Sequence, residues 1–177
     1  MQPETHFSLE AGPKTDLFTA PDKSVVLENA TIQLFDVEGD FQLLARVSAP
    51  LTSTYDAGAL VVYASPDAWG KLALERSPQG EPTIVSVVTR GVSDDANSFA
   101  MPQNTAWLRV SRIGETFAFH ASDDGLWWSL IRWFTIPGGR EARPGVLAQS
   151  PTGDGLLVRF ENVELRPEPV AELRDGS

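Results

Sequence analysis

Hydrophobic and polar residues alternate along most of the chain in short runs that glycine, proline and aspartate interrupt. The clearest example is an apolar run at residues 57–64, a mixed run at 69–76 and a β-branched run at 84–89. Runs of this length, bounded by turn residues, are typical of β-strands. We therefore predict three consecutive strands in this part of the chain.

The mixed run predicts how these strands are oriented. Side chains on a strand point alternately to its two faces. Leu72 and Leu74 consequently share one face, whereas Trp69, Lys71 and Glu75 share the other. We expect the first face to pack against a core and the second to carry charge and an aromatic ring.

The remaining chain predicts more strands of the same kind. They are expected at residues 32–35, 40–47, 106–111, 117–121, 127–136, 146–149 and 156–165, with edge strands at 17–18 and 25–27. The polar stretch 91–104 is expected to be a long loop, and about 1–15 and 166–177 to be irregular ends. No helical periodicity lasts longer than two turns, which favours an all-β sandwich or barrel.

Composition limits the classes of function. A length of 177 residues suits a single domain covering residues 1–177. The 14 basic and 24 acidic residues give a net charge of −10, which argues against a nucleic-acid partner. Cysteine is absent, and no apolar run approaches the roughly 18 residues of a membrane helix. Residues 1–12 lack the pattern of a secretory signal, so we predict a cytoplasmic protein without membrane contact.

Motifs for phosphate binding, zinc proteases, calcium loops and serine hydrolases are absent, and the chain contains only two histidines. We therefore predict no catalytic residue and no cofactor. Calcium is left open, because Asp94 with Asp95, or Asp123 with Asp124, could supply oxygen ligands. For the second pair, an ordinary hairpin turn is the simpler interpretation.

Polar and aromatic residues inside otherwise apolar strands suggest a ligand-binding face. If their strands are neighbours in one sheet, these side chains converge. A solvated outer face would explain the charges equally well, but large rings are unusual there, and an aromatic platform ringed by hydrogen-bonding groups suits a sugar. The candidate ligand-binding residues are Trp69, Lys71, Glu75, Arg90, Asp94, Trp107, Arg109, His120, Arg132 and Gln149. Trp127, Trp128 and Trp133 are instead expected to pack in the core or at its rim.

Several short motifs resemble one known family over about residues 16–160. They are Asp56-Ala57-Gly58, Trp69-Gly70-Lys71-Leu72, residues 85–91 with Ser93-Asp94-Asp95, residues 108–112, residues 120–125 and Gln149-Ser150-Pro151. They are similar to the concanavalin A-like domain family described as regulation of enolase protein 1-like, a domain of unknown function. More distantly, their order resembles the sandwich domain of family 43 glycosidases. The resemblance implies a jelly-roll sandwich of two antiparallel sheets, with ligands held on a concave face.

Together, the residues and the resemblance predict a lectin-like binding domain. Its ligand would be a carbohydrate or a small polar or anionic metabolite on the concave sheet. One alternative is a regulatory protein of carbon metabolism that acts through a protein partner. Another is a sugar-active enzyme with Glu75 as acid or base and His120 assisting. The acidic ExDxxE spacing of glycosidases with this fold is missing, so a non-enzyme is favoured.

Overall fold

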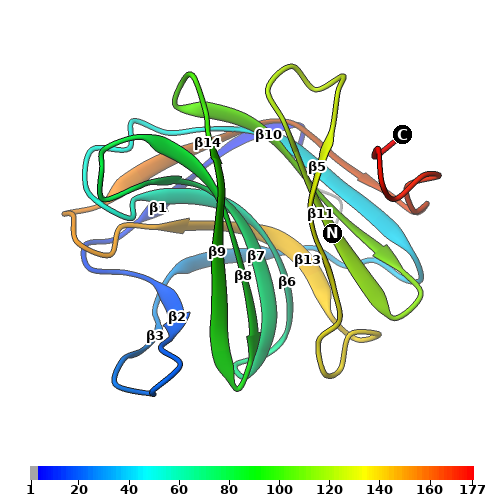
Figure 1. Cartoon of the computed structure of the whole chain (residues 1–177), viewed down its shortest axis with the longest axis horizontal. Coiled ribbons are helices and arrows are strands. Elements are labelled where there is room, and N and C mark those ends of the chain that lie inside the picture. The colour runs from blue at the N-terminus through cyan, green and yellow to red at the C-terminus, as the bar shows by residue number, and fades with distance from the viewer. Residues whose placement is uncertain (1–3) are drawn as a thin grey trace.

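The computed structural model describes residues 4–177 as two six-stranded antiparallel sheets and one small two-stranded sheet (Figure 1). Sheet I contains, in spatial order, β1 (His6–Ala11), β14 (Leu156–Arg166), β5 (Phe41–Ser48), β10 (Thr105–Ile113), β11 (Thr116–Ser122) and β12 (Ser129–Phe134). Sheet II contains β4 (Thr31–Leu34), β13 (Arg143–Gln149), β6 (Ala57–Ser65), β7 (Ala68–Arg76), β8 (Pro82–Arg90) and β9 (Val92–Ala100). The small sheet pairs β2 (Leu17–Thr19) with β3 (Val26–Glu28). The predicted all-β sandwich of two antiparallel sheets is confirmed.

The main core lies between the two large sheets. Alternation along the strands turns side chains such as Leu43, Val110 and Phe160 of sheet I and Leu60 and Leu72 of sheet II inward, where all five are fully buried. Removing this apolar surface from water is the main force that holds the two sheets together.

Two glycines of the recognised motifs allow the sheets to approach closely. A Cβ on Gly58 would lie 2.4 Å from a methyl group of Val158, and one on Gly70 would lie 2.8 Å from the ring of Phe134. Both distances are shorter than real contacts, so any larger residue would push the sheets apart. Gly58 and Gly70 are therefore explained by packing rather than by a ligand.

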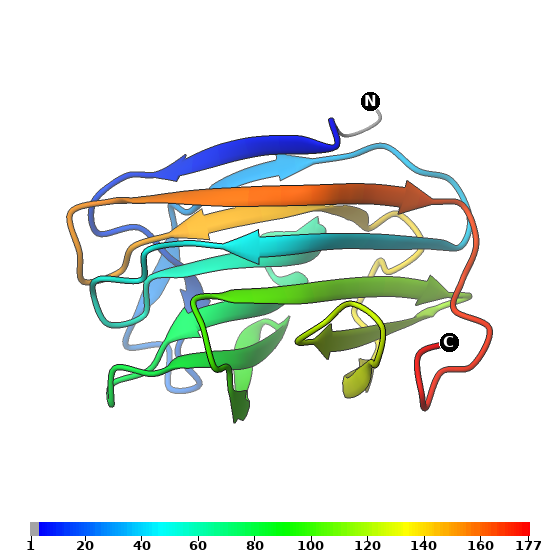
Figure 2. The same ribbon diagram turned by 90° about the horizontal axis from the view of Figure 1, so that it is seen from above.

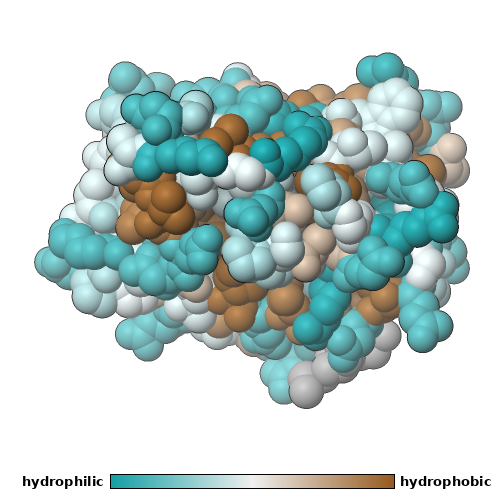
Figure 3. Space-filling model, turned by 90° about the horizontal axis from the view of Figure 1, so that it is seen from below, coloured by the Kyte–Doolittle hydropathy of each residue, from teal (hydrophilic) through white to brown (hydrophobic). Residues whose placement is uncertain are grey.

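A second, smaller hydrophobic cluster lies on the outer face of sheet II, beneath the β2–β3 sheet. Leu17 of β2 packs there with Trp69, Val87 and Leu147. Figure 3 shows the molecule from the side opposite to that in Figure 2, with hydrophobic patches lying between hydrophilic residues. Part of the outer face of sheet II is thus covered by the chain itself.

Two segments differ from the sequence-based expectation. The stretch 91–104 contains the strand β9, which forms an edge of sheet II and exposes most of its residues. Polar composition is compatible with an edge strand, because one side of such a strand faces water. Residues 6–11 form β1 on β14, whereas an irregular end was expected. The predicted edge strands at 17–18 and 25–27 are confirmed as β2 and β3.

The segment after β14 forms turns and folds back onto sheet I (Figure 2). Val170 of this segment is buried. The carbonyl groups of Gly176 and Leu173 in the same segment bond to the side chains of Arg109 on β10 and His120 on β11. Residues 4–177 contain no helix that is long and apolar enough to cross a membrane.

Candidate ligand-binding pocket

A pocket of about 280 Å³ opens on the outer face of sheet II. Its floor comes from β7, β8 and β13, and its walls come from β9, the start of β2 and the loop before β6. The residues that line it are Asp16, Phe18, Tyr55, Lys71, Glu75, Val85, Val87, Asp95 and Gln149. Polar and aromatic side chains thus meet around one hollow, as in many small-molecule sites.

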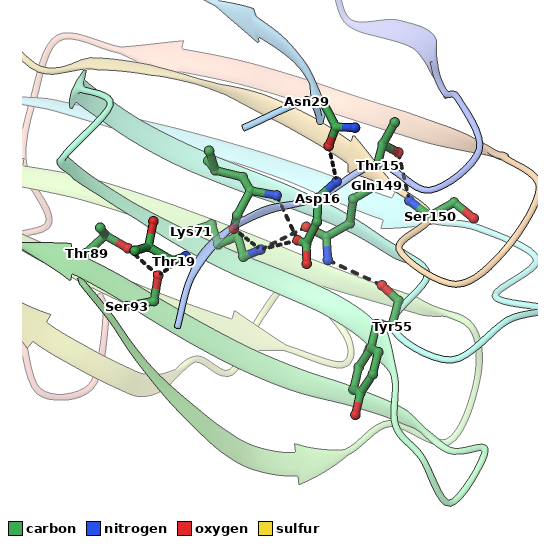
Figure 4. Close-up of polar contacts among 11 residues, drawn as sticks. Thr15, Asp16, Thr19, Asn29, Tyr55, Lys71, Thr89, Ser93, Gln149 and Ser150 are labelled. Carbon is green, nitrogen blue, oxygen red and sulfur yellow. Dashed lines mark hydrogen bonds and ion pairs between the residues drawn. The ribbon is translucent and has the colours of Figure 1, made fainter. Parts of the chain in front are cut away.

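Lys71 is buried in the floor of this pocket and joins three segments (Figure 4). Its ammonium group donates to the Leu17 carbonyl at 2.7 Å, to Gln149 Oε1 at 2.8 Å and to Asp16 Oδ1 at 3.3 Å. An ammonium group has three N–H donors, so these acceptors use all of them. Lys71 therefore holds the wall of the pocket in place and has no donor left for a ligand.

The wall that carries Tyr55 is fixed by a buried carboxylate. Asp56 is fully buried and accepts hydrogen bonds from the backbone N–H groups of Thr52 and Ser53 and from Ser150 Oγ at 2.7 Å. Tyr55 beside it has a φ of +68°, in the left-handed region that is uncommon for residues other than glycine. The Tyr55 carbonyl accepts from Gln149 Nε2 at 3.3 Å. These bonds stabilise a strained loop that presents Tyr55 to the pocket.

The opposite wall is held by two hydroxyl groups. Ser93 Oγ of β9 accepts a hydrogen bond from the Thr19 backbone N–H at 3.0 Å and lies 2.8 Å from Thr89 Oγ. Both hydroxyl groups are buried, so the bonds fix β2 against the edge of sheet II (Figure 4). Phe18 is thereby kept at the rim of the pocket.

Glu75 differs from the other polar residues of the pocket. It is partly buried, and within residues 4–177 its carboxyl group has no hydrogen bond and no ion pair within 4 Å. Burial raises the pKa of Glu75 to about 7, an effect that nearby Lys71 opposes and the negative charges of Asp16 and Asp95 reinforce. At neutral pH this carboxyl group can therefore both donate and accept hydrogen bonds.

Three of the ten candidate residues, Lys71, Glu75 and Gln149, meet in this pocket. Asp16 and Tyr55 were missed because they lie outside the predicted strands, and Phe18 was missed although an edge strand was predicted at 17–18. Asp95 was assigned to a loop, whereas its place opposite Val87 in β9 turns it toward the pocket.

Trp69 does share a strand face with Lys71, but it is only 1% exposed. Its ring packs in the cluster beneath β2, and its indole N–H donates to the Pro66 carbonyl at 3.1 Å. The prediction that Trp69 forms an open stacking platform is wrong. The aromatic rings that remain accessible in the pocket belong to Phe18 and Tyr55.

Trp107, Arg109 and His120 lie on sheet I, on the far side of the core from Lys71 and Glu75. Arg109 and His120 are direct cross-strand partners between β10 and β11, both are buried, and Trp107 is half-buried beside them. The expected convergence of all ten residues on one surface is therefore wrong. The alternation of side chains along each strand correctly groups these three with each other, but it does not show whether their strands belong to the same sheet as β7.

Asp94 and Arg132 lie on the edge strands β9 and β12, and Arg90 is the last residue of β8. Arg132 of β12 donates to the Asp94 carbonyl at 3.0 Å and lies 3.3 Å from its carboxylate, which links sheet I to sheet II. Arg90 donates to the Thr135 carbonyl at 2.9 Å. These contacts hold the edges together, so we assign no ligand to them.

A larger depression of about 540 Å³ beside Arg90 is lined mainly by the loop 135–141. Two of its charged side chains, Glu115 and Arg140, form an ion pair and are 68% and 74% exposed. Solvated charges that already pair with each other provide little basis for recognition. The smaller pocket at Glu75 is the better candidate.

The hairpin between β11 and β12 has two notable features. Asp124 accepts from the backbone N–H groups of Leu126 and Trp127, as expected for the predicted turn. Trp127 is 82% exposed and Trp133 53% exposed, so the prediction that these rings pack in the core or at its rim is wrong for Trp127.

In residues 4–177 no group of three or more acidic or histidine side chains is placed to hold a metal ion.

The comparisons with known proteins agree with the fold. The model of a family described as a protein of unknown function, DUF1349, matches residues 1–168. The chain belongs to this family. It is 26% identical over 159 residues to "Regulation of enolase protein 1" of Saccharomyces cerevisiae, covering 89% of this chain and 80% of the relative. The predicted family resemblance is thereby confirmed.

Solved structures extend this relationship. A functionally unknown protein from Saccharomyces cerevisiae has a TM-score of 0.84 at 25% identity, covering 93% of this chain and 89% of that one. The family 43 glycoside hydrolase BlXynB of Bacillus licheniformis has a TM-score of 0.74 at 14% identity. That match covers 92% of this chain but 33% of the hydrolase, so it shows a shared sandwich fold and no shared activity.

Proposed function

We propose that this DUF1349 domain binds a small neutral polyhydroxylated ligand, of the carbohydrate class, in the pocket at Glu75. The observation that carries the proposal is a partly buried carboxyl group without a hydrogen-bond partner at the floor of a hollow. Buried polar groups are normally satisfied, and a sugar hydroxyl can both donate to and accept from such a group. Phe18 and Tyr55 add aromatic surface on which the apolar face of a sugar ring can pack.

The size of the pocket supports a ligand no larger than one or two sugar rings. Its volume of about 280 Å³ is at the lower end of the ~300–1,000 Å³ that is usual for pockets of drug-sized ligands. A similar sandwich fold occurs in a protein described as a xylan beta-1,4-xylosidase, which makes neutral pentoses and hexoses a reasonable first set of probes.

Charge makes an anionic ligand the weaker candidate. Asp16, Glu75 and Asp95 bring three carboxyl groups to the pocket, and among residues 4–177 Lys71 is the one cation that lines it. The three N–H donors of Lys71 are already used by protein acceptors. A carboxylate or phosphate would therefore meet net negative charge without a free cationic donor.

The test is a thermal-shift and calorimetric screen of xylose, xylobiose, arabinose and glucose, with glucuronic acid as the anionic probe. We expect saturable stabilisation by at least one neutral sugar and weaker binding of the acid. Glu75→Gln should weaken the binding at least about tenfold, because it alters the hydrogen-bonding group at the pocket floor.

Glu10→Gln provides the matched control, since Glu10 is exposed on β1 of the other sheet. It should leave sugar binding unchanged. Absence of a saturable response to every neutral sugar, or equal responses in the intact chain and in Glu75→Gln, would contradict the proposal.

A second candidate function is contact with a protein partner. Leu126 and Trp127 are 78% and 82% exposed at the tip of the β11–β12 hairpin, and exposed apolar groups of this size are common at interfaces. The yeast relative is described as a regulator of enolase, so purified enolase is the partner to test. Binding in gel filtration that Trp127→Ser removes and Glu75→Gln leaves intact would favour this function over the pocket.

A further inference from the structure

The outer face of sheet I contains a buried cationic cluster beneath the last segment of the chain. Arg109 is 6% exposed and His120 is fully buried, and the register of β10 and β11 places them side by side. The Arg109 guanidinium lies 4.3 Å from the centre of the Trp128 ring. The residues 170–177, which we call the cover, bond to both side chains. Figure 2 shows this end of the chain turning back after β14.

The hydrogen bonds of the cluster are incomplete. Arg109 Nη2 donates to the Gly176 carbonyl, and the Leu173 carbonyl lies 2.8 Å from His120 Nε2. Arg109 Nε and the Ser111 hydroxyl, which follows on the same strand face, are buried without a hydrogen-bond partner. A buried guanidinium normally pairs with a carboxylate, because removing its charge from water is costly. No carboxylate in residues 4–177 lies within 4 Å of Arg109.

Arg112, three residues further along β10, shows what a satisfied buried arginine looks like in the same strand. Its guanidinium donates to the carbonyl groups of Gly39, Arg140 and Ala142, and the acidic Asp40 and Glu141 act favourably on its charge. Arg109, whose pKa burial lowers, is instead influenced by the positive charge of Arg166, which repels its own charge and lowers its pKa further. Arg112 therefore has a structural role, whereas the contacts of Arg109 do not explain its burial.

We propose that Arg109, Ser111 and His120 form a binding site for a small oxyanion, such as a phosphate or carboxylate group, which the cover closes in this structure. The planar N–H groups of an arginine match two oxygens of such an anion. Carbonyl oxygens of Leu173 and Gly176 now accept two of the bonds that the oxygens of the ligand would take. An anion would also use the Arg109 Nε and Ser111 donors, which the cover leaves unpartnered.

Gly176 lies in the cover at a position where an added methyl group would collide with the cluster. Gly176 has a φ of +73°, and a Cβ there would lie 2.5 Å from Arg109 Nη2, 2.8 Å from Trp128 Cβ and 3.0 Å from His120 Cδ2. Gly176→Ala should therefore move the cover away from the cluster. Gly91 has a similar φ of +77°, but a Cβ there would contact nothing within 4 Å, so Gly91→Ala is a matched control.

The experiment is a titration of the full chain and its variants with inorganic phosphate, against sodium chloride of equal ionic strength. Calorimetry measures the affinity, and tryptophan fluorescence reports on Trp128. We expect weak saturable binding to the intact chain, because phosphate must displace the cover. Gly176→Ala should bind roughly tenfold more tightly, and Gly91→Ala should match the intact chain.

Arg109→Gln should remove phosphate binding in both the intact and the Gly176→Ala backgrounds, whereas Glu75→Gln should leave it unchanged. That last variant separates this site from the sugar pocket, so either proposal can fail alone. If Arg109→Gln does not fold, Arg109→Lys replaces it and should weaken binding, because its point charge lacks the fork of donors. No saturable binding to either the intact chain or Gly176→Ala, or equal binding after substitution of Arg109, would overturn the proposal.

Discussion

Two polar regions lie on the outer faces of the two sheets. They differ in the sign of their charge, in their exposure to solvent and in how fully their hydrogen-bond donors are used. The pocket on sheet II is open, has three carboxyl groups against one lysine, and uses every donor of that lysine. The covered cluster on sheet I is closed, has a cation without a carboxylate partner, and leaves donor atoms unpartnered. These differences are why we propose a neutral ligand for the first region and an anion for the second.

The difference also separates two roles for a buried cation. Lys71 joins β7 to β13 and to the residues before β2, so its charge helps to build the wall of a site. Arg109 donates one hydrogen bond to the cover and otherwise lies against the ring of Trp128, which precedes β12. Burial of a charge alone therefore does not mark a ligand site, and the number of unused donors is the more informative property.

The largest effect that this comparison predicts is on stability at Lys71. Lys71→Met removes a buried ammonium and leaves Asp16, Gln149 and the Leu17 carbonyl without their donor. We expect a loss of about 3–5 kcal/mol in the free energy of unfolding, measured by urea denaturation at pH 7. Arg46→Met is the control, because the Arg46–Glu161 pair is 40% exposed at each side chain and should contribute about 0–1 kcal/mol. Equal losses would contradict a structural role for Lys71.

The next effect is a pH-dependent gain in stability at Glu75. The folded-state pKa of Glu75 is raised from 4.5 to about 7, so its ionisation destabilises the folded state as the pH rises through this range. Glu75→Gln removes that cost. We expect the variant to be more stable than the intact chain by about 1–3 kcal/mol at pH 8.5 and equally stable near pH 4. Urea denaturation at both pH values provides the measurement, and a gain of equal size at both would contradict the raised pKa.

Much of the fold could be predicted from the sequence because strand parity and turn residues are local properties. The runs at 57–64, 69–76 and 84–89 correspond to β6, β7 and β8, and Leu72 and Leu74 of β7 face the core as expected. The edge strand β9 was missed, because its polar residues face solvent and lack apolar alternation. Gly91, two residues after the β-branched run, is the turn residue that could have indicated a hairpin there.

The site was harder to predict because it depends on which strands become neighbours. The alternation of side chains along a strand places Lys71 and Arg109 on the outward faces of their own strands, but β7 and β10 belong to different sheets. Local sequence also does not show that β2 covers Trp69, or that Asp16 reaches Lys71 from 55 residues away. Such long-range contacts are determined by the tertiary packing of the whole domain.

A smaller effect is expected when the cation of the covered cluster is removed. Arg109→Met replaces a buried guanidinium, whose burial is costly and is not offset by a carboxylate within residues 4–177, with a shorter apolar side chain. We expect the free energy of unfolding to change by less than about 1 kcal/mol, in contrast to Lys71→Met. Urea denaturation of the two variants under the same conditions makes the comparison. A loss at Arg109 as large as that at Lys71 would show that the cover contact is itself a major source of stability.

The smallest effect is the contribution of His120 to stability in mild acid. Burial lowers the pKa of His120, and the positive charge of Arg109 lowers it further, whereas the bond to Leu173 and the charge of Asp175 act in the opposite direction. The unfolded chain therefore binds a proton below about pH 6.5 more readily than the folded chain, and stability is lost as the pH falls through and below this value. This slope is opposite to that of Glu75, so the two partly cancel in the intact chain. In the Glu75→Gln background we expect the decline below pH 6.5 to be visible by thermal denaturation and to disappear in His120→Gln. It should persist in His6→Gln, where the replaced ring is exposed on β1.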